Sequence, residues 1–268
     1  MNATLYKQML QVHLKGFLNY AFGSAFYILL MFWLYPGIAR NAKAIDDLVA
    51  SMPAGVGKAF SLNGFGSAEA FISGEYYGLL LVLILAVVSV QVATRLMAKL
   101  VDQGSMAYLL ATPTTRAKVA FTQAGVLVTG LALILAVTTA AGFLGSAWFL
   151  NGEEVNPAKF LQMNAAAFLL FFAVGGVAFL ISSLSNDEKK AAGLSGAVTF
   201  GFFSLDLLGK LSDSLDWMRA LSPFSLYRPG EIINGQMALT GPFLLLAGIG
   251  LAAFALAIIL FRKRDLPL

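Results

Sequence analysis

Six stretches of this sequence are long and apolar enough to cross a lipid bilayer as helices, and they constrain the fold more than any motif does. A helix needs about 20 mostly apolar residues to cross the hydrocarbon core. The stretches are approximately residues 17–38, 77–96, 118–148, 160–184, 191–209 and 242–261. We therefore predict an all-α integral membrane protein, with residues 1–268 forming one transmembrane domain. Six spans leave no room in this chain for a soluble catalytic domain.

The composition agrees with a membrane protein and argues against a nucleic-acid partner. Hydrophobic residues make up 59% of the chain and charged residues 12%, too few to cover a soluble globule. The net charge is +4, but the basic residues are scattered over the loops and do not gather on one face. The chain has no cysteine, which excludes disulfides and thiolate metal sites. We expect no nucleic-acid binding and no metal site.

The basic residues also predict the orientation, because Lys and Arg near the ends of spans favour the cytoplasmic side. With the N-terminus inside, 11 of the 18 Lys and Arg residues lie in the cytoplasm, among them Arg262, Lys263 and Arg264 after the last span. Most acidic residues then lie outside. We expect a multi-pass protein of the bacterial plasma membrane with both termini in the cytoplasm.

Residues 1–16 predict an amphipathic helix at the inner membrane surface. Lys7, Gln11 and Lys15 recur every four residues, and apolar side chains occupy the opposite face. This helix either anchors the chain to lipid only or also contacts a cytoplasmic partner. Beyond the first span, Ile45, Leu48, Val49 and Met52 have helical spacing and stop at Pro53, which predicts a short helix on the outer surface.

A short polar segment, residues 102–116, interrupts the apolar pattern between the second and third spans. Gly104 suits the left-handed conformation that ends a helix, and Ser105 can cap the next helix with its hydroxyl. Three apolar residues follow on one face and Pro113 forbids continuation, so we predict a helix of one or two turns parallel to the membrane. Those apolar residues, a candidate contact face, are Met106, Leu109 and Leu110. An ordinary turn between two membrane helices is the alternative.

This segment resembles the permeases of the ABC-2 family, the membrane subunits of many ATP-driven exporters with the type V exporter fold. In that family, the second span runs into an acidic, Gly-Thr, Leu-Leu, Thr-Pro, Arg pattern where a helix docks on the nucleotide-binding subunit. The matching residues here are Asp102, Gly104, Ser105, Leu109, Leu110, Thr112, Pro113 and Arg116. Asp102 stands where Glu is usual, and Ser105 where Thr is usual. The six-span layout, residues 75–78, 221–224 and 261–265 also resemble that family.

The resemblance implies that this chain is one part of a larger machine. It implies two copies of a separate ABC ATPase subunit, which would bind ATP and Mg²⁺, and a second permease half that is identical or related. The chain itself has no Gly-x-x-x-x-Gly-Lys-Ser/Thr loop, so we expect it to hydrolyse no ATP and to hold no cofactor. Asp102, Gly104, Ser105, Met106, Leu109, Leu110, Thr112, Pro113 and Arg116 are then the candidate ATPase-coupling residues.

The inventory of reactive side chains argues against catalysis. His13 is the sole histidine and lies in the predicted interfacial helix, so Ser-His and zinc-His chemistry lack their parts. Asp206 is the one acidic residue clearly inside a span, and a charge there is costly. We interpret it as a partner of Lys210, one turn away; the alternative is a substrate or proton site.

Aromatic residues suggest where cargo could pass. Phe26 and Trp33 in the first span, and Phe200 and Phe203 in the fifth, are candidate lining of an apolar cavity between two permease halves. Contact with lipid and packing inside the bundle are the alternatives for each side chain. The leading hypothesis is an ATP-driven exporter of an amphipathic peptide, lipopeptide or hydrophobic antibiotic. An ion-gradient-driven secondary transporter, or an immunity or sensor subunit that does not transport, remain as alternatives.

Overall fold

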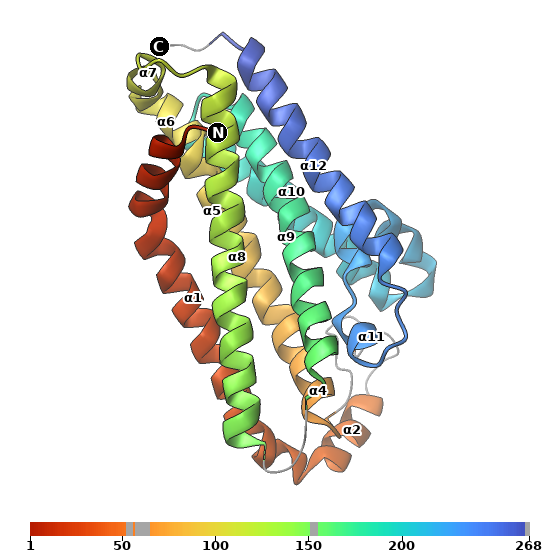
Figure 1. Ribbon diagram of the computed structural model, residues 1–268. Coiled ribbons are helices and arrows are strands. Elements are labelled where there is room, and N and C mark those ends of the chain that lie inside the picture. The colour runs from red at the N-terminus through yellow and green to blue at the C-terminus, as the bar shows by residue number, and fades with distance from the viewer. Residues whose placement is uncertain (52–55, 57–64, 151–154, 266–268) are drawn as a thin grey trace.

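The computed structural model describes residues 1–51, 56, 65–150 and 155–265, and its described part contains helices and no strands. Six helical segments are long and apolar enough to span a membrane, and they run side by side in one elongated bundle (Figure 1). They are α1 (Ala3–Ala39), the segment Ala68–Asp102, α8 (Arg116–Phe149), α9 (Pro157–Leu184), α10 (Glu188–Leu211) and α12 (Thr240–Lys263). The predicted all-α membrane fold is confirmed.

The start of α1 and the end of α12 lie at one end of the bundle, beside α6 (Ala98–Asp102) and α7 (Ser105–Leu110) (Figure 1). We call this the α7 end. The opposite end carries α2 (Ala42–Ala50), α4 (Ala68–Phe71) and α11 (Pro229–Ile233), and we call it the α11 end. The predicted short helix near residues 45–49 is confirmed as α2, while Met52 and Pro53 lie outside the described residues.

The first helix runs without a break from Ala3 to Ala39, so the predicted interfacial helix and first span are parts of one helix. Its start is capped by Asn2, whose side chain accepts a hydrogen bond from the Leu5 backbone N–H. The predicted boundary near residue 16 is not marked by any interruption. The sequence has no proline near this point, and the single glycine there, Gly16, is tolerated within a helix.

The second span is longer and less regular than the predicted 77–96. It begins with α4 and a π-helix, η1 (Ile72–Leu80), continues as α5 (Leu81–Leu96) and, after a break at Met97, ends in α6. At the break, the Ser182 hydroxyl of α9 accepts a hydrogen bond from the Ala98 N–H (3.1 Å) and donates one to the Ala93 carbonyl (2.9 Å). Ser182 therefore satisfies backbone groups that the interrupted helix cannot pair.

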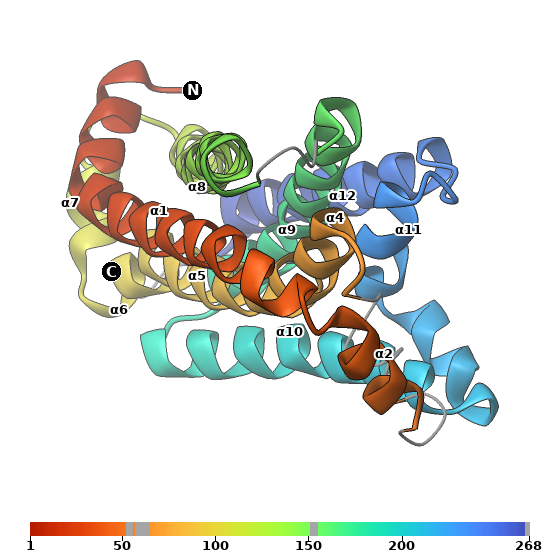
Figure 2. The same ribbon diagram turned by 90° about the horizontal axis from the view of Figure 1, so that it is seen from below.

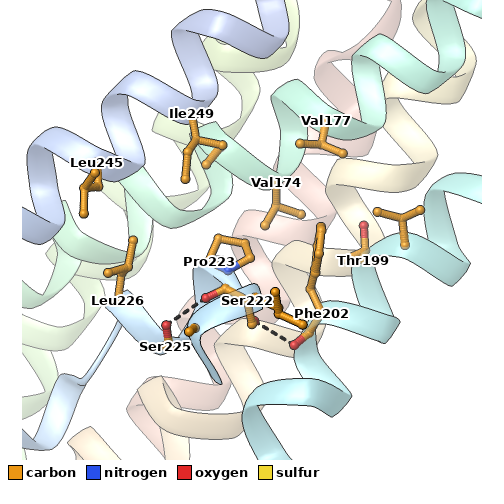
Figure 3. A pocket seen from close by; sticks show the side chains of 14 residues that line it. Val174, Val177, Thr199, Phe202, Ser222, Pro223, Ser225, Leu226, Leu245 and Ile249 are labelled. Carbon is orange, nitrogen blue, oxygen red and sulfur yellow. Dashed lines mark hydrogen bonds between the residues drawn. The ribbon is translucent and has the colours of Figure 1, made fainter. Parts of the chain in front are cut away.

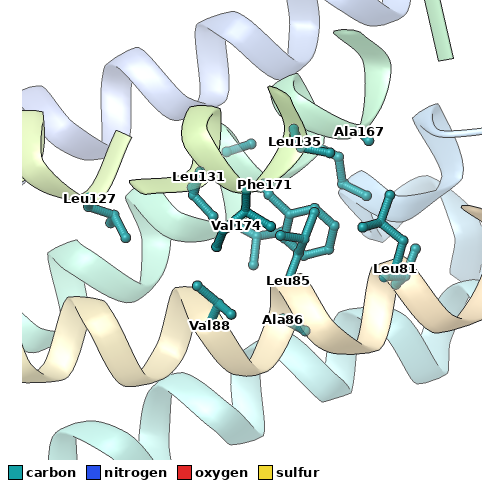
Figure 4. Packing of buried hydrophobic residues seen from close by; sticks show 14 of the residues in the cluster. Leu81, Leu85, Ala86, Val88, Leu127, Leu131, Leu135, Ala167, Phe171 and Val174 are labelled. Carbon is teal, nitrogen blue, oxygen red and sulfur yellow. The ribbon is translucent and has the colours of Figure 1, made fainter. Parts of the chain in front are cut away.

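Helix α9 is the centre of the bundle, since α5, α8, α10 and α12 all pack against it, whereas α1 packs mainly on α8 (Figure 2). Branched and aromatic side chains of α5, α8 and α9 interlock in the core (Figure 4). Fully buried examples are Leu85, Leu127, Leu131 and Phe171. Because lipid tails are as apolar as these side chains, close van der Waals packing holds the helices together.

Glycines allow the helix α8 to approach its neighbours closely. A Cβ atom on Gly130 would lie 2.1 Å from Cε1 of Phe17, a fully buried ring of α1. Glycines at 142 and 145 similarly face the rings of Phe160 and Phe32. These contacts form a seam of glycines and rings, mainly between α1 and α8.

We expect Gly130→Ala to destabilise the protein by about 2 kcal/mol, because the new methyl group overlaps the Phe17 ring and the packed core leaves that ring nowhere to move. Thermal unfolding in detergent measures the effect. Gly125→Ala on the same helix is the control, because its Cβ would have no neighbour nearer than 3.6 Å. Equal melting temperatures for the two variants would contradict the role assigned to this seam.

Candidate functional site

The predicted short helix is present as α7, and its bounds match the sequence pattern. It follows Gly104, which has the left-handed backbone angle φ of 69°. One detail of the prediction is wrong: Gly104 occupies the capping position and Ser105 is the first helical residue, so its hydroxyl does not cap the helix. The helix ends at Leu110, three residues before Pro113.

The apolar stripe of α7 faces its own bundle. Met106 is fully buried, and Leu109 and Leu110 are half-buried against the core. Met106 is therefore not available to a partner and holds α7 against the bundle, whereas Leu109 and Leu110 stay candidate contact residues. The side chain that α7 presents outward is Tyr108, which is 81% exposed. Sequence reasoning missed Tyr108, although helical spacing places it opposite Met106.

Residues after α7 tie the loop to the start of the chain. The Thr112 hydroxyl donates to the Leu109 carbonyl (2.6 Å), which helps to end α7. The Asn2 side-chain amide donates to the Thr114 hydroxyl (3.1 Å), and the Asn2 backbone N–H donates to Thr122 of α8 (3.0 Å). The start of α1, the loop after α7 and the first turns of α8 therefore form one hydrogen-bonded unit.

Asp102 connects the α7 region to α10. Its carboxylate accepts a hydrogen bond from the Glu188 backbone N–H (3.1 Å), in the first turn of α10. Lys99 of α6 pairs with the Glu188 side chain at 3.3 Å. The first turn of a helix attracts a carboxylate through its free N–H groups and its dipole. The turn between α9 and α10 thus lies directly against α6, a contact that the sequence did not reveal.

Arg116 and Arg264 connect α8 to the ends of α9 and α12. The Arg116 guanidinium donates to the Arg264 carbonyl. The Arg264 guanidinium in turn donates to the carbonyls of Ser183 (2.6 Å) and Ser185 (3.2 Å) and to the Asn186 side chain. Partial burial lowers the pKa of Arg264. Arg264 thus caps the C-terminal end of α9; the sequence marked it only as part of a basic run.

The aromatic lining between two permease halves stays a prediction, and in this chain three of its four candidate side chains are exposed. Phe26, Trp33 and Phe200 are 58%, 59% and 38% exposed on the outside of the bundle. Phe203 packs against Phe224, with their ring centroids 5.7 Å apart. The exposed rings of α1 and α10 would therefore meet lipid or another protein chain.

Two apolar pockets do open on the bundle, at places that the sequence did not indicate. One, of about 420 Å³, lies between α9, α10, α12 and the segment η2 (Asp213–Leu221) and η3 (Pro223–Leu226) (Figure 3). The other, of about 470 Å³, lies between the start of α1, α8, α9 and α12. Among the described residues, no three His, Asp or Glu side chains group as a metal site.

Asp206 is buried and paired, as the sequence indicated. Its carboxylate lies 2.8 Å from Lys210 Nζ and 3.3 Å from Arg219 Nε of η2. The Arg219 contribution was not predicted, because residue 219 lies on another element. This group joins the end of α10 to η2 near the α11 end of the bundle.

Comparison of the sequence with known protein families identifies a family of membrane transport proteins. A family model described as the C-terminal domain of the multidrug efflux system permease Rv1217c matches residues 10–262. The chain belongs to this family. Together with six apolar helices, membership of this multidrug efflux permease family makes the chain a multi-pass membrane permease of an efflux system. No curated protein matches the chain in a sequence search.

Proposed function

We propose that this efflux permease is of the ABC-2 type and is driven by two copies of a separate ATPase that docks on α7. The observation that carries the proposal is the exposed Tyr108 on a short helix whose other face is buried in the bundle. A helix held firmly on one side and bare on the other suits a docking element. Exposed tyrosines of this kind often anchor interfaces.

The charges around α7 support a cytoplasmic position for this end. The exposed basic residues here include Lys7, Arg95, Lys118, Lys189, Lys190, Arg262 and Lys263. Such an excess is typical of the cytoplasmic side of a bacterial plasma membrane. Both termini are then cytoplasmic, and an ATPase surface of acidic character would complement this end.

The contacts of the α7 region offer a physical route for coupling. Asp102 links it to α10, Arg116 and Arg264 link it to α9 and α12, and Asn2 links it to α1. ATP binding would close the ATPase dimer and displace α7, and these bonds would carry the displacement into four of the spans. The chain itself would hydrolyse no ATP and hold no cofactor, with ATP and Mg²⁺ on the partner.

The exposed apolar surface of the bundle indicates the class of cargo and the position of a second permease half. Phe26, Trp33 and Phe200 present aromatic rings outside the bundle, where a second permease half, identical or related, could complete a pathway. Such a lining suits an amphipathic peptide, a lipopeptide or a hydrophobic antibiotic. It offers no charged group to an ionic substrate.

Co-expression with the ATPase encoded beside this chain tests the proposal. We expect the two proteins to co-purify, and we expect inverted membrane vesicles to accumulate a fluorescent hydrophobic drug when ATP is added. An ATPase variant that cannot hydrolyse ATP is the control. Accumulation that needs an ion gradient and no ATP, or failure of any ATPase to co-purify, would contradict an ATP-driven mechanism.

A further inference from the structure

The pocket between α9, α10 and α12 is an apolar space that is open on one side and has a defined floor (Figure 3). Val174 and Val177 of α9 form one wall, and Thr199 and Phe202 of α10 form another. The floor is the turn at Ser222 and Pro223, which joins η2 to η3. Side chains from three spans and one connecting segment therefore converge on a volume of about 420 Å³.

Hydrogen bonds hold the floor in place. The Ser222 hydroxyl donates to the Phe202 carbonyl (2.7 Å) and accepts from the Phe224 backbone N–H (3.2 Å). The Ser225 hydroxyl donates to the Ser222 carbonyl (2.8 Å). The Ser222 hydroxyl thus ties the floor to α10, the Ser225 hydroxyl braces the floor itself, and neither hydroxyl is free to donate to an occupant. The pocket is thus preformed.

The lining selects an uncharged occupant. No charged side chain is among the residues that line the pocket, and an ion entering it would lose its hydration without a replacement. The volume falls in the usual range for sites that hold drug-sized molecules. The apolar lining therefore favours a compact hydrophobic molecule, which is stabilised by close van der Waals contact with Val, Leu and Phe side chains.

The mouth of the pocket opens toward the side of the bundle. Helices α10 and α12 both pack on α9 and lie apart from each other (Figure 2). Leu221, Leu245 and Ile249 stand at the rim and are 58%, 57% and 38% exposed. Leu245 and Ile249 lie on the spanning helix α12, and where no second chain covers them such exposed apolar side chains face lipid tails. A molecule dissolved in the bilayer can therefore enter sideways.

We propose that this pocket binds compact, uncharged hydrophobic compounds that enter it laterally from the bilayer, and that among the proposed cargoes it holds the hydrophobic antibiotics. The inference rests on the proposed function for the export step. The closed floor favours a compact compound over a lipid, whose acyl chain must remain attached to a headgroup at the membrane surface. The lining residues come from one chain, so binding needs neither the ATPase nor a second permease half.

The test uses the purified full-length chain in phosphatidylcholine liposomes, without ATPase, and the neutral fluorescent probe N-phenyl-1-naphthylamine. Val198→Trp places a large ring in the pocket, and we expect saturable probe binding to weaken at least tenfold. Ala197→Trp is the matched control, because residue 197 is the exposed neighbour on α10 and does not line the pocket; its affinity should stay within twofold. Ile249→Trp narrows the mouth and replaces Val198→Trp if that variant does not fold.

Equal affinities for the pocket and control variants would overturn the proposal. A second result would also overturn it: no probe binding, together with phospholipid that co-purifies with the wild type and the control but not with Val198→Trp. The occupant would then be an acyl chain. Probe binding that needs the pocket, without ATP-driven efflux, would refute the proposed function and leave the binding site standing. Undiminished probe efflux by Val198→Trp would instead remove the pocket from the export route.

Discussion

Replacing Tyr108 with alanine is expected to reduce ATP-driven efflux at least tenfold while leaving the melting temperature unchanged. The ring is 81% exposed on α7, so its removal opens no cavity in the bundle. If it anchors the ATPase, its loss should cost about 2 kcal/mol or more of binding free energy, which is about a thirtyfold loss of affinity. Co-purification of the ATPase and drug accumulation in inverted vesicles measure the two effects.

Two matched variants separate docking from folding. Met106→Ala removes a fully buried side chain two residues away, so we expect it to lower stability by about 2 kcal/mol through the cavity it leaves. Trp217→Ala removes another exposed aromatic ring, 61% exposed and near the α11 end, and should leave efflux unchanged. Normal ATPase binding by Tyr108→Ala would show that α7 is not the docking element.

The features of this protein that follow from local chemistry could be predicted. Runs of apolar residues located the six spanning helices, because a bilayer forces the backbone to pair within each helix. Gly104 and Pro113 located α7, because one suits a left-handed turn and the other cannot continue a helix. Asp206 and Lys210 are one helical turn apart, so their pairing could also be anticipated.

The remaining features depend on contacts between distant residues. Met106, Leu109 and Leu110 form an apolar stripe that fits a partner or the chain's own core equally well, and only the packed bundle shows that it faces inward. Asp102 reaches Glu188, and Arg264 reaches the end of α9, across at least 79 residues of sequence. No periodic pattern in the sequence predicts either contact.

The second span shows a different limit. Its predicted start at residue 77 reflects where continuous hydrophobicity begins, but the structure starts the helical segment at Ala68 and includes Glu75 in a π-helix. Tyr227 donates a hydrogen bond from its hydroxyl to the Tyr77 carbonyl (3.1 Å), and neighbouring elements bury both rings. Tertiary packing therefore maintains helix where hydropathy alone gives no reason for it.

Asp206→Ala is expected to lower the free energy of unfolding by about 3 kcal/mol, because it leaves the charges of Lys210 and Arg219 with one counter-ion fewer in a largely buried position. The side chains around Asp206 are tightly packed. A Cβ atom on Gly209 would lie 2.3 Å from Cγ of Arg219, so the arginine stem crosses the backbone of α10 at close contact. Losing the carboxylate should therefore loosen η2 from α10, which denaturation in detergent measures.

A comparison of two acidic residues isolates the effect of burial. Glu231→Ala breaks the pair with Arg228, in which both side chains are more than 40% exposed, and should cost less than about 1 kcal/mol. Asp206→Asn tests the alternative that the carboxylate acts in transport. If the Asp206→Asn protein that reaches the membrane exports drug at the normal rate, the carboxylate serves as an ionic link between α10 and η2. Normal stability with lost efflux would instead assign Asp206 to the transport pathway.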